Sequence, residues 1–184
     1  MSACRADITT DAGLEAVADA AGDDVHCLVN NAGINRDGRA AKLTPDDFSS
    51  VIRVDLVAPA LLAERLRPAL SGGSVVNIAS RAALGNFGQA NYVAAKSGLI
   101  GLTRSLALQW APDVRVNAVA PGLIETPMTG SMPPDVLAKL VARVPSGRIG
   151  TPEDVADTVA HLVSPAASYV TGQVLFVCGG RSIG

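Results

Sequence analysis

Short apolar runs alternate along the chain with longer segments in which apolar residues recur every three or four positions. The short runs are rich in β-branched residues and end at Asn, Gly, Pro or Ser, as buried strands do. The pattern predicts four strands, at 26–30, 74–79, 114–119 and 173–178. Buried strands that alternate with helices predict an α/β fold, with a doubly wound parallel sheet and helices on both faces.

Capping residues mark where the helices begin. Thr44 suits an N-cap, with Pro45 at the first helical position and Asp47 at the third. The helix that starts there is expected to continue to about Leu70, because Gly72-Gly73 is the first break. Further helices are predicted at 91–110, near 136–144 and from 151 to about 164, and the Pro-containing segment 123–146 is interpreted as a mobile lid.

The composition is that of a single folded domain over residues 1–184. Hydrophobic residues make up 48% of the chain and charged residues 17%, which excludes a disordered chain. The net charge of −2 is spread without a basic stripe, so we expect no nucleic-acid partner. We find neither an apolar run of membrane-spanning length nor a signal peptide, and therefore expect a cytoplasmic protein with no membrane partner. Cys4, Cys27 and Cys178 lack metal-ligand spacing, so no metal site is expected.

Tyr92 and Lys96 are the most informative residues for chemistry. Their spacing of four places them on one face of the predicted helix. A Lys ammonium beside a phenol favours the phenolate, so we expect the pKa of Tyr92 to be lowered. Such a phenol can give a proton to a ketone oxygen, or take one from an alcohol. Ser80, twelve residues before Tyr92, could hydrogen-bond the same oxygen.

Several polar or turn-forming residues fall where the predicted strands end. Asn31, Ser80 and Pro121-Gly122 each follow a strand. In open parallel sheets, ligands bind beyond the carboxyl ends of the strands. Tyr92 and Lys96 begin the helix after the second of these strands. We therefore expect one cleft at this edge of the sheet to bring the three chemical side chains together.

Motifs along most of the chain point to one family. They are Asn30-Asn31-Ala32-Gly33, Ser80, Tyr92-x-x-x-Lys96, Pro121-Gly122 with Thr126, Tyr169-Val170-Thr171-Gly172-Gln173 and Gly179-Gly180. As a set, from about Asp7 onward, they resemble the short-chain dehydrogenase/reductase family. The runs 85–92 and 148–156 are most similar to 3-oxoacyl-(acyl-carrier-protein) reductases and to related acetoacetyl-CoA and polyketide ketoreductases. The resemblance implies a Rossmann-like fold.

The resemblance also implies roles for individual residues in an NAD(P)-dependent oxidoreductase. Tyr92 would be the general acid for ketone reduction, Lys96 would lower its pKa and bind the nicotinamide ribose, and Ser80 would hold the substrate carbonyl. The hydride would come from NADPH or NADH. The cofactor would also contact Asp7 and Ile8 beside the adenine, Asn31, Ala32 and Gly33, Pro121 and Gly122, the backbone of Ile124, and Thr126. Asp7 has an alternative of equal weight, as the N-cap of a helix over 9–18.

The chain departs from the family pattern in three ways. It has no two Gly residues spaced i, i+2, so it lacks the Gly-rich turn that receives the cofactor pyrophosphate. By resemblance it is N-terminally truncated and lacks the first two βα units, which would leave the strand at 26–30 as an exposed edge. Asp55 stands where the family has a catalytic Asn, and its carboxylate would offset the charge of Lys96 and raise the pKa of Tyr92. The loop between Ser80 and Tyr92 is one residue shorter than in the closer relatives, which places Ala79 at the ungapped position.

The sequence is compatible with two functions. The first is NAD(P)-dependent reduction of a 3-oxoacyl thioester or a similar ketone, either a small molecule or a carrier-bound acyl group. The second is a non-catalytic homologue that acts as a structural partner subunit of a complete reductase. An incomplete polypeptide is a third explanation of the missing region. The resemblance implies a homo- or hetero-oligomer, a dimer or tetramer built through the helix at 91–110 and the strand at 173–178.

Overall fold

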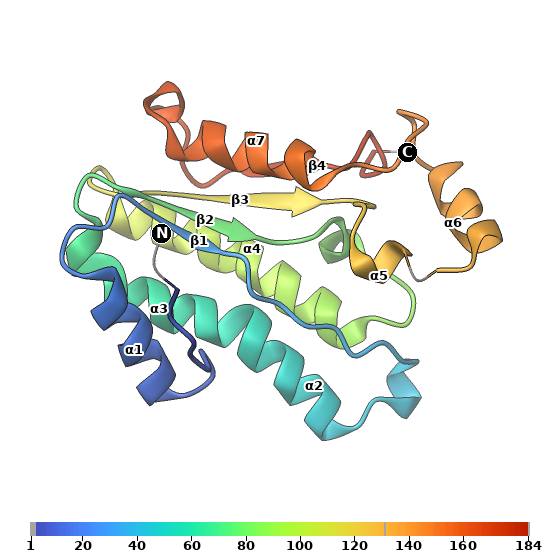
Figure 1. The fold of residues 1–184 in the computed structure, drawn as a ribbon, viewed down its shortest axis with the longest axis horizontal. Helices are drawn as coiled ribbons and strands as arrows, with labels where there is room; N and C mark the ends of the chain where they lie inside the picture. The colour runs from blue at the N-terminus through green and yellow to red at the C-terminus, as the bar shows by residue number, and fades with distance from the viewer. Residues whose placement is uncertain (1–2, 131, 184) are drawn as a thin grey trace.

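The centre of the molecule is a sheet of four parallel strands in the order β1-β2-β3-β4 (Figure 1). The structure is a computed structural model and describes residues 3–130 and 132–183. β1 spans Cys27–Asn30, β2 Ser74–Ile78, β3 Arg115–Pro121 and β4 Val174–Val177. The four strands predicted from the sequence are confirmed, with shifts of one or two residues at their ends.

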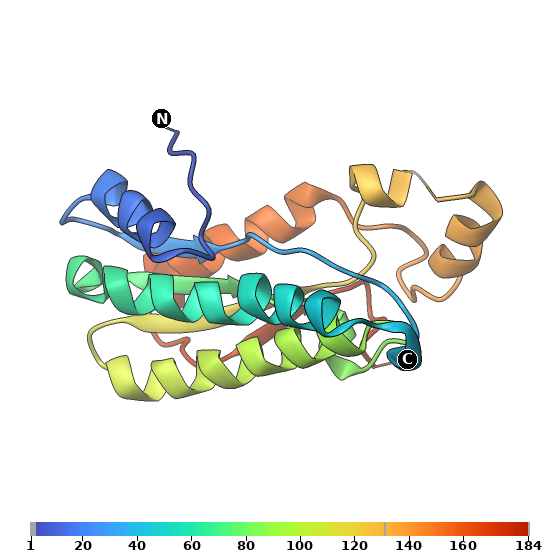
Figure 2. The same ribbon diagram turned by 90° about the horizontal axis from the view of Figure 1, so that it is seen from below.

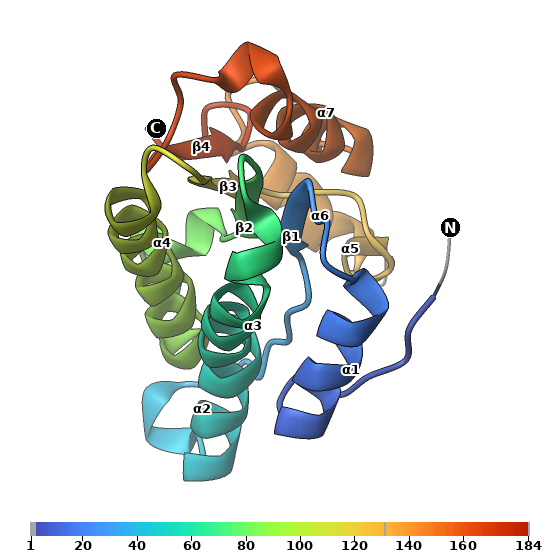
Figure 3. The ribbon, with the colours of Figure 1, turned by 90° about the vertical axis from the view of Figure 1, so that its left-hand side faces the viewer.

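Helices cover both faces of the sheet (Figures 1 and 3). One face carries α7 (Pro152–Val163). The other carries α1 (Asp11–Ala21), α2 (Pro45–Ile52), α3 (Ala58–Leu66) and α4 (Ala90–Trp110), with α2 and α4 side by side (Figure 2). This three-layer arrangement around a parallel sheet confirms the Rossmann-like α/β fold.

Apolar residues are packed on both faces of the sheet. Val75 and Val116 face the larger core, under α1, α3 and α4. Val76 and Val119 face the smaller one, where they pack against Leu162 of α7. Successive side chains of a strand point to opposite faces, so the adjacent residues Val75 and Val76 belong to different cores although both are fully buried.

A buried polar chain ties two strands to the long helix. The Nδ2 of Asn30 in β1 donates to the Oδ1 of Asn77 in β2 at 2.8 Å. The Nδ2 of Asn77 donates to the Oγ1 of Thr103 in α4 at 2.9 Å, and this hydroxyl donates to the Leu99 carbonyl at 2.8 Å. All of these groups lie in buried residues. This series of hydrogen bonds therefore fixes α4, which carries Tyr92 and Lys96, against the strands that end at the candidate site.

The helix predicted at 44–70 is interrupted. Its start is confirmed, because Thr44 and Asp47 form a reciprocal capping box. However, α2 passes into a π-helical turn at Arg53–Val57 before α3 begins, and a 3₁₀ turn follows at Arg67–Leu70. A π turn adds a residue to the helical turn without any capping residue, so the apolar pattern gave no sign of it. Asp55 lies in this turn and is fully buried.

Two other expectations about helices are wrong in detail. The first helix is capped by Thr10, whose hydroxyl accepts from the Gly13 N–H at 3.0 Å. Asp7 is not the cap, since its carboxylate accepts from the backbone N–H and the hydroxyl of Thr9. The segment 123–146 contains two helices where one was predicted, namely α5 (Pro127–Gly130) and α6 (Pro134–Val141). Short 3₁₀ turns lie at Ala40–Lys42, Arg81–Leu84 and Pro165–Ala167.

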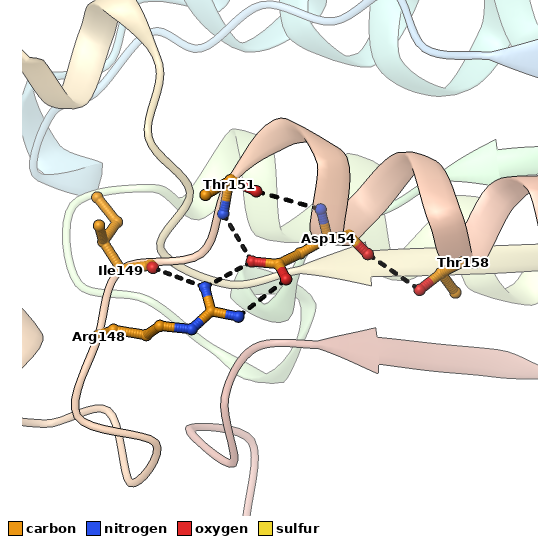
Figure 4. A network of polar contacts seen from close by, with 5 residues as sticks. All are labelled: Arg148, Ile149, Thr151, Asp154 and Thr158. Carbon is orange, nitrogen blue, oxygen red and sulfur yellow. Dashed lines mark hydrogen bonds and ion pairs between the residues drawn. The ribbon is translucent and has the colours of Figure 1, made fainter.

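The start of α7 is held by a polar network (Figure 4). Thr151 is the N-cap, as the sequence predicts, and its N–H donates to the Asp154 carboxylate at 2.8 Å. Arg148 donates to both oxygens of that carboxylate, at 2.6 and 2.9 Å. These hydrogen bonds hold the pKa of the Asp154 carboxyl well below its usual range. The network fixes the loop before α7 to the helix itself.

β1 forms one edge of the sheet. Within residues 3–130 and 132–183 it pairs with β2 alone. The side chains of Cys27 and Val29 are exposed, Val29 to 39%. The exposed edge expected from the sequence is therefore confirmed. No helix in the described part of the chain is long and apolar enough to cross a membrane.

Candidate active site

A cavity of about 420 Å³ opens where the carboxyl ends of β1, β2 and β3 meet. Tyr92 and Lys96, from the first turns of α4, line it together with Ser80, which follows β2. Asn31, Gly33 and Pro121-Gly122 line the same cavity. The expectation that these residues converge on one cleft is confirmed.

Lys96 is almost completely enclosed at the floor of the cavity. Its side chain is 5% exposed, and its Nζ donates to the Ile78 carbonyl at 2.9 Å. The Nζ also lies 3.1 Å from Oδ2 of Asp55 and 5.5 Å from the centre of the Tyr92 ring. Burial lowers the pKa of the Lys96 ammonium, and the neighbouring Asp55 carboxylate opposes that shift. The ammonium is thus shared between a carboxylate, a carbonyl and the face of the phenol.

Asp55 is a buried partner of Lys96. Its Oδ1 accepts from the Ile34 N–H at 2.8 Å. Its Oδ2 forms an ion pair with Lys96, but the atoms are not aligned for a hydrogen bond. A Cβ built on Gly33 would lie only 3.1 Å from this oxygen, so a side chain at that position would require the Asp55 carboxylate to move slightly. The expectation that Asp55 offsets the charge of Lys96 is therefore confirmed by geometry.

The pKa of Tyr92 is raised, which contradicts the expectation that Lys96 lowers it. Burial of the phenol is the largest cause. The Ser80 side chain acts in the opposite direction as a hydrogen-bonding partner, whereas the negative charges of Asp55 and Asp37 raise the pKa further. The spacing of Tyr92 and Lys96 indicated their proximity correctly, but it carried no information on burial or on the carboxylate that compensates the ammonium.

Ser80 stands at the end of β2 and caps the short turn Arg81–Leu84. Its Oγ accepts from the Ala82 N–H at 3.1 Å, so the hydroxyl proton is not used in that bond. Ala79 also lines the cavity but offers only a methyl group. The shortened loop therefore keeps the Ser80 hydroxyl in the cavity.

Asn91 is a positioning residue that motif reasoning left without a role. It is fully buried, and its Oδ1 accepts from the Tyr92 N–H at 2.8 Å. Its Nδ2 donates to the carbonyls of Arg36 at 3.0 Å and Asp47 at 3.3 Å. Asn91 thus ties the start of α4 to two other segments. The available signal was an amide side chain in a first helical turn, where four N–H groups need acceptors.

Of the other residues expected to bind the cofactor, some line a second cavity and some line neither cavity. Ile124 and Thr126, with Asn31 and Pro121, line a second cavity of about 640 Å³ beside α7. Gly122 packs so closely on β4 that an added Cβ would lie 2.7 Å from the Cα of Cys178. Asp7, Ile8 and Ala32 do not belong to the lining of either cavity. Ile8 packs against the core under α1, so the adenine role of Asp7 and Ile8 stays a prediction.

The match to a family model decides the classification. A model described as enoyl-(acyl carrier protein) reductase matches residues 1–182. The chain belongs to the short-chain dehydrogenase/reductase family. This confirms the resemblance carried by the sequence motifs.

Named relatives of this short-chain dehydrogenase/reductase include two 3-oxoacyl-(acyl-carrier-protein) reductases. That of Thermotoga maritima is 43% identical over 170 residues, which cover 86% of this chain and 67% of the relative. That of Vibrio cholerae is 40% identical over 181 residues, which cover 94% and 74%. A hydroxy(phenyl)methylsuccinyl-CoA dehydrogenase subunit, BbsD of Thauera aromatica, is 43% identical over 163 residues, or 86% and 66%. The chain thus spans about two thirds of the length of most of these curated relatives.

Proposed function

We propose that this short-chain dehydrogenase/reductase uses NADPH or NADH to reduce the ketone of a 3-oxoacyl thioester, or of a similar compound, to a hydroxyl group. The observation that carries the proposal is the single cavity shared by Ser80, Tyr92 and Lys96. The names of the relatives support an acyl thioester. The family model is described as an enoyl reductase, but the two relatives named as 3-oxoacyl reductases favour a ketone as the group reduced.

The residues at the cavity fit the nicotinamide end of such a cofactor. An ammonium has three N–H donors. Lys96 donates one hydrogen bond, to the Ile78 carbonyl, and meets Asp55 as an ion pair, so at least one donor remains for a ribose hydroxyl. The Asn31 side chain lines the cavity and makes no hydrogen bond within the described residues. When bound, the cofactor would supply the hydride. The residues fit only the nicotinamide end of the cofactor, because the chain has no Gly-rich turn for the pyrophosphate.

The protein's own contribution is a proton and a fixed place for the ketone oxygen. Ser80 would donate a hydrogen bond to that oxygen and orient it toward Tyr92. The phenol of Tyr92 would then give its proton to the same oxygen and become a phenolate. Lys96, 5.5 Å from the ring centre, would stabilise the phenolate electrostatically.

Turnover tests the proposal directly. Because the chain has no Gly-rich turn for the pyrophosphate, it is first fused to the Gly-rich βαβ segment of a relative. The fused protein is incubated with NADPH and acetoacetyl-CoA, and NADPH consumption is followed by its near-ultraviolet absorbance. We expect Tyr92→Phe to reduce the rate by about 10²–10⁴-fold, the usual loss when a general acid is removed. Tyr169→Phe is the matched control, because Tyr169 is fully exposed and lies outside the cavity. Equal rates for Tyr92→Phe and the unmodified protein would exclude the proposed acid.

A structural partner subunit is the second candidate function. It is favoured by a large exposed apolar side chain on each of α2, α3 and α4, namely Phe48 at 40%, Leu61 at 47% and Leu108 at 83%. Exposed apolar patches often mark protein interfaces. We propose a dimer or tetramer through these helices in either function. Light scattering would measure the mass, and Leu108→Gln should shift it toward the monomer.

A further inference from the structure

The cavity carries a positive charge that the proposed chemistry does not use. Arg81, next to Ser80 in the chain, lines the cavity, and so does Arg181, from the turn that follows β4. Lys96, the third cation there, already has Asp55 as its partner at 3.1 Å. Among the described residues, no acidic side chain lines the cavity. The two arginines therefore leave it with a net positive charge.

Neither arginine pairs with another side chain among the described residues. In the described part of the chain, the guanidinium groups of Arg81 and Arg181 make no ion pair or hydrogen bond, and the Nε of Arg81 is buried without a partner. By contrast, Arg67 and Arg148 are each held by a carboxylate. A buried donor without an acceptor is costly and is therefore rare in native structures. The vacant donors point to an acceptor that a ligand supplies.

A third arginine adds positive charge near the pair without lining the cavity. Arg143 lies just beyond the end of α6. Burial is the largest cause that lowers the pKa of Arg181, and the charges of Arg81 and Arg143 lower it further. The turn that carries Arg181 is tied to the loop before α7, because the Gly179 carbonyl accepts from the Ser146 N–H at 3.0 Å. Three like charges held within interacting distance repel one another until an anion binds.

We propose that the arginine cluster, Arg81 and Arg181, binds an anionic oxygen group of the substrate, a carboxylate or a phosphate. The planar guanidinium fork matches either group with two parallel hydrogen bonds. Arg81 adjoins Ser80 and lines the same cavity, so the anion that Arg81 binds belongs to the same molecule as the ketone that Ser80 holds. The link to a ketone rests on the proposed function, but anion binding itself requires neither cofactor nor turnover. The preferred substrate is therefore an anionic oxo compound rather than a neutral one.

Calorimetric titration of the chain without cofactor tests the cluster. The probes are 3-oxoglutarate, a ketone with a carboxylate on each side, and its uncharged diethyl ester. We expect the dianion to bind at least about tenfold more tightly than the ester, since hydrogen bonds between charged groups are the strong ones. Arg81→Gln and Arg181→Gln should each remove most of this preference. Arg104→Gln, an exposed arginine of α4 outside the cavity, should leave it unchanged.

A second pair of probes identifies the source of the anion. If phosphate is the group bound, acetoacetyl-CoA should bind more tightly than the phosphate-free acetoacetyl-N-acetylcysteamine, and Arg181→Gln should abolish that difference. Arg181→Lys keeps the charge and should retain part of the preference, which separates loss of charge from loss of folding. Equal binding within both pairs, or an equal loss in Arg104→Gln, would overturn the anion site. Turnover without anion preference would contradict this site and leave the proposed reductase function intact.

Discussion

Asp55 is the residue at which this chain departs most from its family's chemistry. The resemblance implies an Asn at this position, whereas here a fully buried carboxylate lies 3.1 Å from the Lys96 ammonium. The carboxylate reduces the positive field that Lys96 exerts on the phenol, and it is one of the groups that raise the pKa of Tyr92. A phenol with a raised pKa is a weaker proton donor. Asp55 is therefore expected to slow the reduction of a ketone.

Replacing Asp55 by Asn should speed ketone reduction. The amide oxygen can still accept from the Ile34 N–H, so the π turn is expected to be kept. The change removes one cause of the raised pKa of Tyr92, and a fall of one pKa unit corresponds to about 1.4 kcal/mol. We expect a gain of about two- to tenfold, measured as kcat from NADPH consumption in the chain fused to the Gly-rich βαβ segment of a relative. For alcohol oxidation, which needs the phenolate, the rising limb of the pH–rate profile should shift to lower pH.

Asp37→Asn is the matched control for that experiment. Asp37 also raises the pKa of Tyr92, but its effect is smaller than that of Asp55. It accepts hydrogen bonds from Gln89 and Asn35 instead of pairing with Lys96. Its substitution should move the pH profile in the same direction by less. An unchanged or slower rate of reduction in Asp55→Asn, with normal folding, would show that the carboxylate supports the reaction instead of restraining it.

At the scale of elements, the buried hydrogen bonds from Asn30 through Asn77 to Thr103 determine where α4 lies. Replacing Asn77 by Ala would leave the Asn30 amide and the Thr103 hydroxyl without their partner in a buried place. Each buried group left unsatisfied costs about 1–3 kcal/mol. We therefore expect the free energy of unfolding to fall by about 3 kcal/mol, measured by urea denaturation.

A double-mutant cycle separates the Asn77–Thr103 contact from general loss of packing. Thr103→Val keeps the shape of the side chain but removes its hydroxyl, and direct partners usually show a coupling energy of about 0.5–3 kcal/mol. Ser97→Ala is the control on the same helix, because its hydroxyl bonds the Ala83 carbonyl at an exposed position. A coupling energy near zero would mean that the buried hydrogen bonds do not hold α4 in place.

At the scale of the whole molecule, the elements that position the site could be predicted from the sequence because their signals are local. The apolar runs gave all four strands, and the capping boxes of Thr44 and Thr151 gave two helix starts. The π turn around Asp55 and the raised pKa of Tyr92 depend on packing between segments far apart in the chain. Arg181 lies about a hundred residues from Ser80, so no local pattern showed that they share a cavity. Spacing thus predicts which residues meet, but burial and charge balance have to be observed.

The division of the cofactor site leads to a prediction about the 184-residue chain by itself. It offers Lys96, Asn31 and a cavity to the nicotinamide end, but no two Gly residues spaced i, i+2 to receive a pyrophosphate at a helix start. In this fold that turn supplies backbone N–H donors and the positive end of a helix dipole. We expect the chain to bind NADPH with a dissociation constant above about 1 mM, equivalent to a binding free energy weaker than about −4 kcal/mol. Fluorescence titration measures the affinity, and Tyr92→Phe, which keeps the aromatic ring, serves as the control for the nicotinamide end. Micromolar binding would mean that other residues of this chain hold the phosphates, and the arginine cluster would then be tested first, by titrating NADPH into Arg181→Gln.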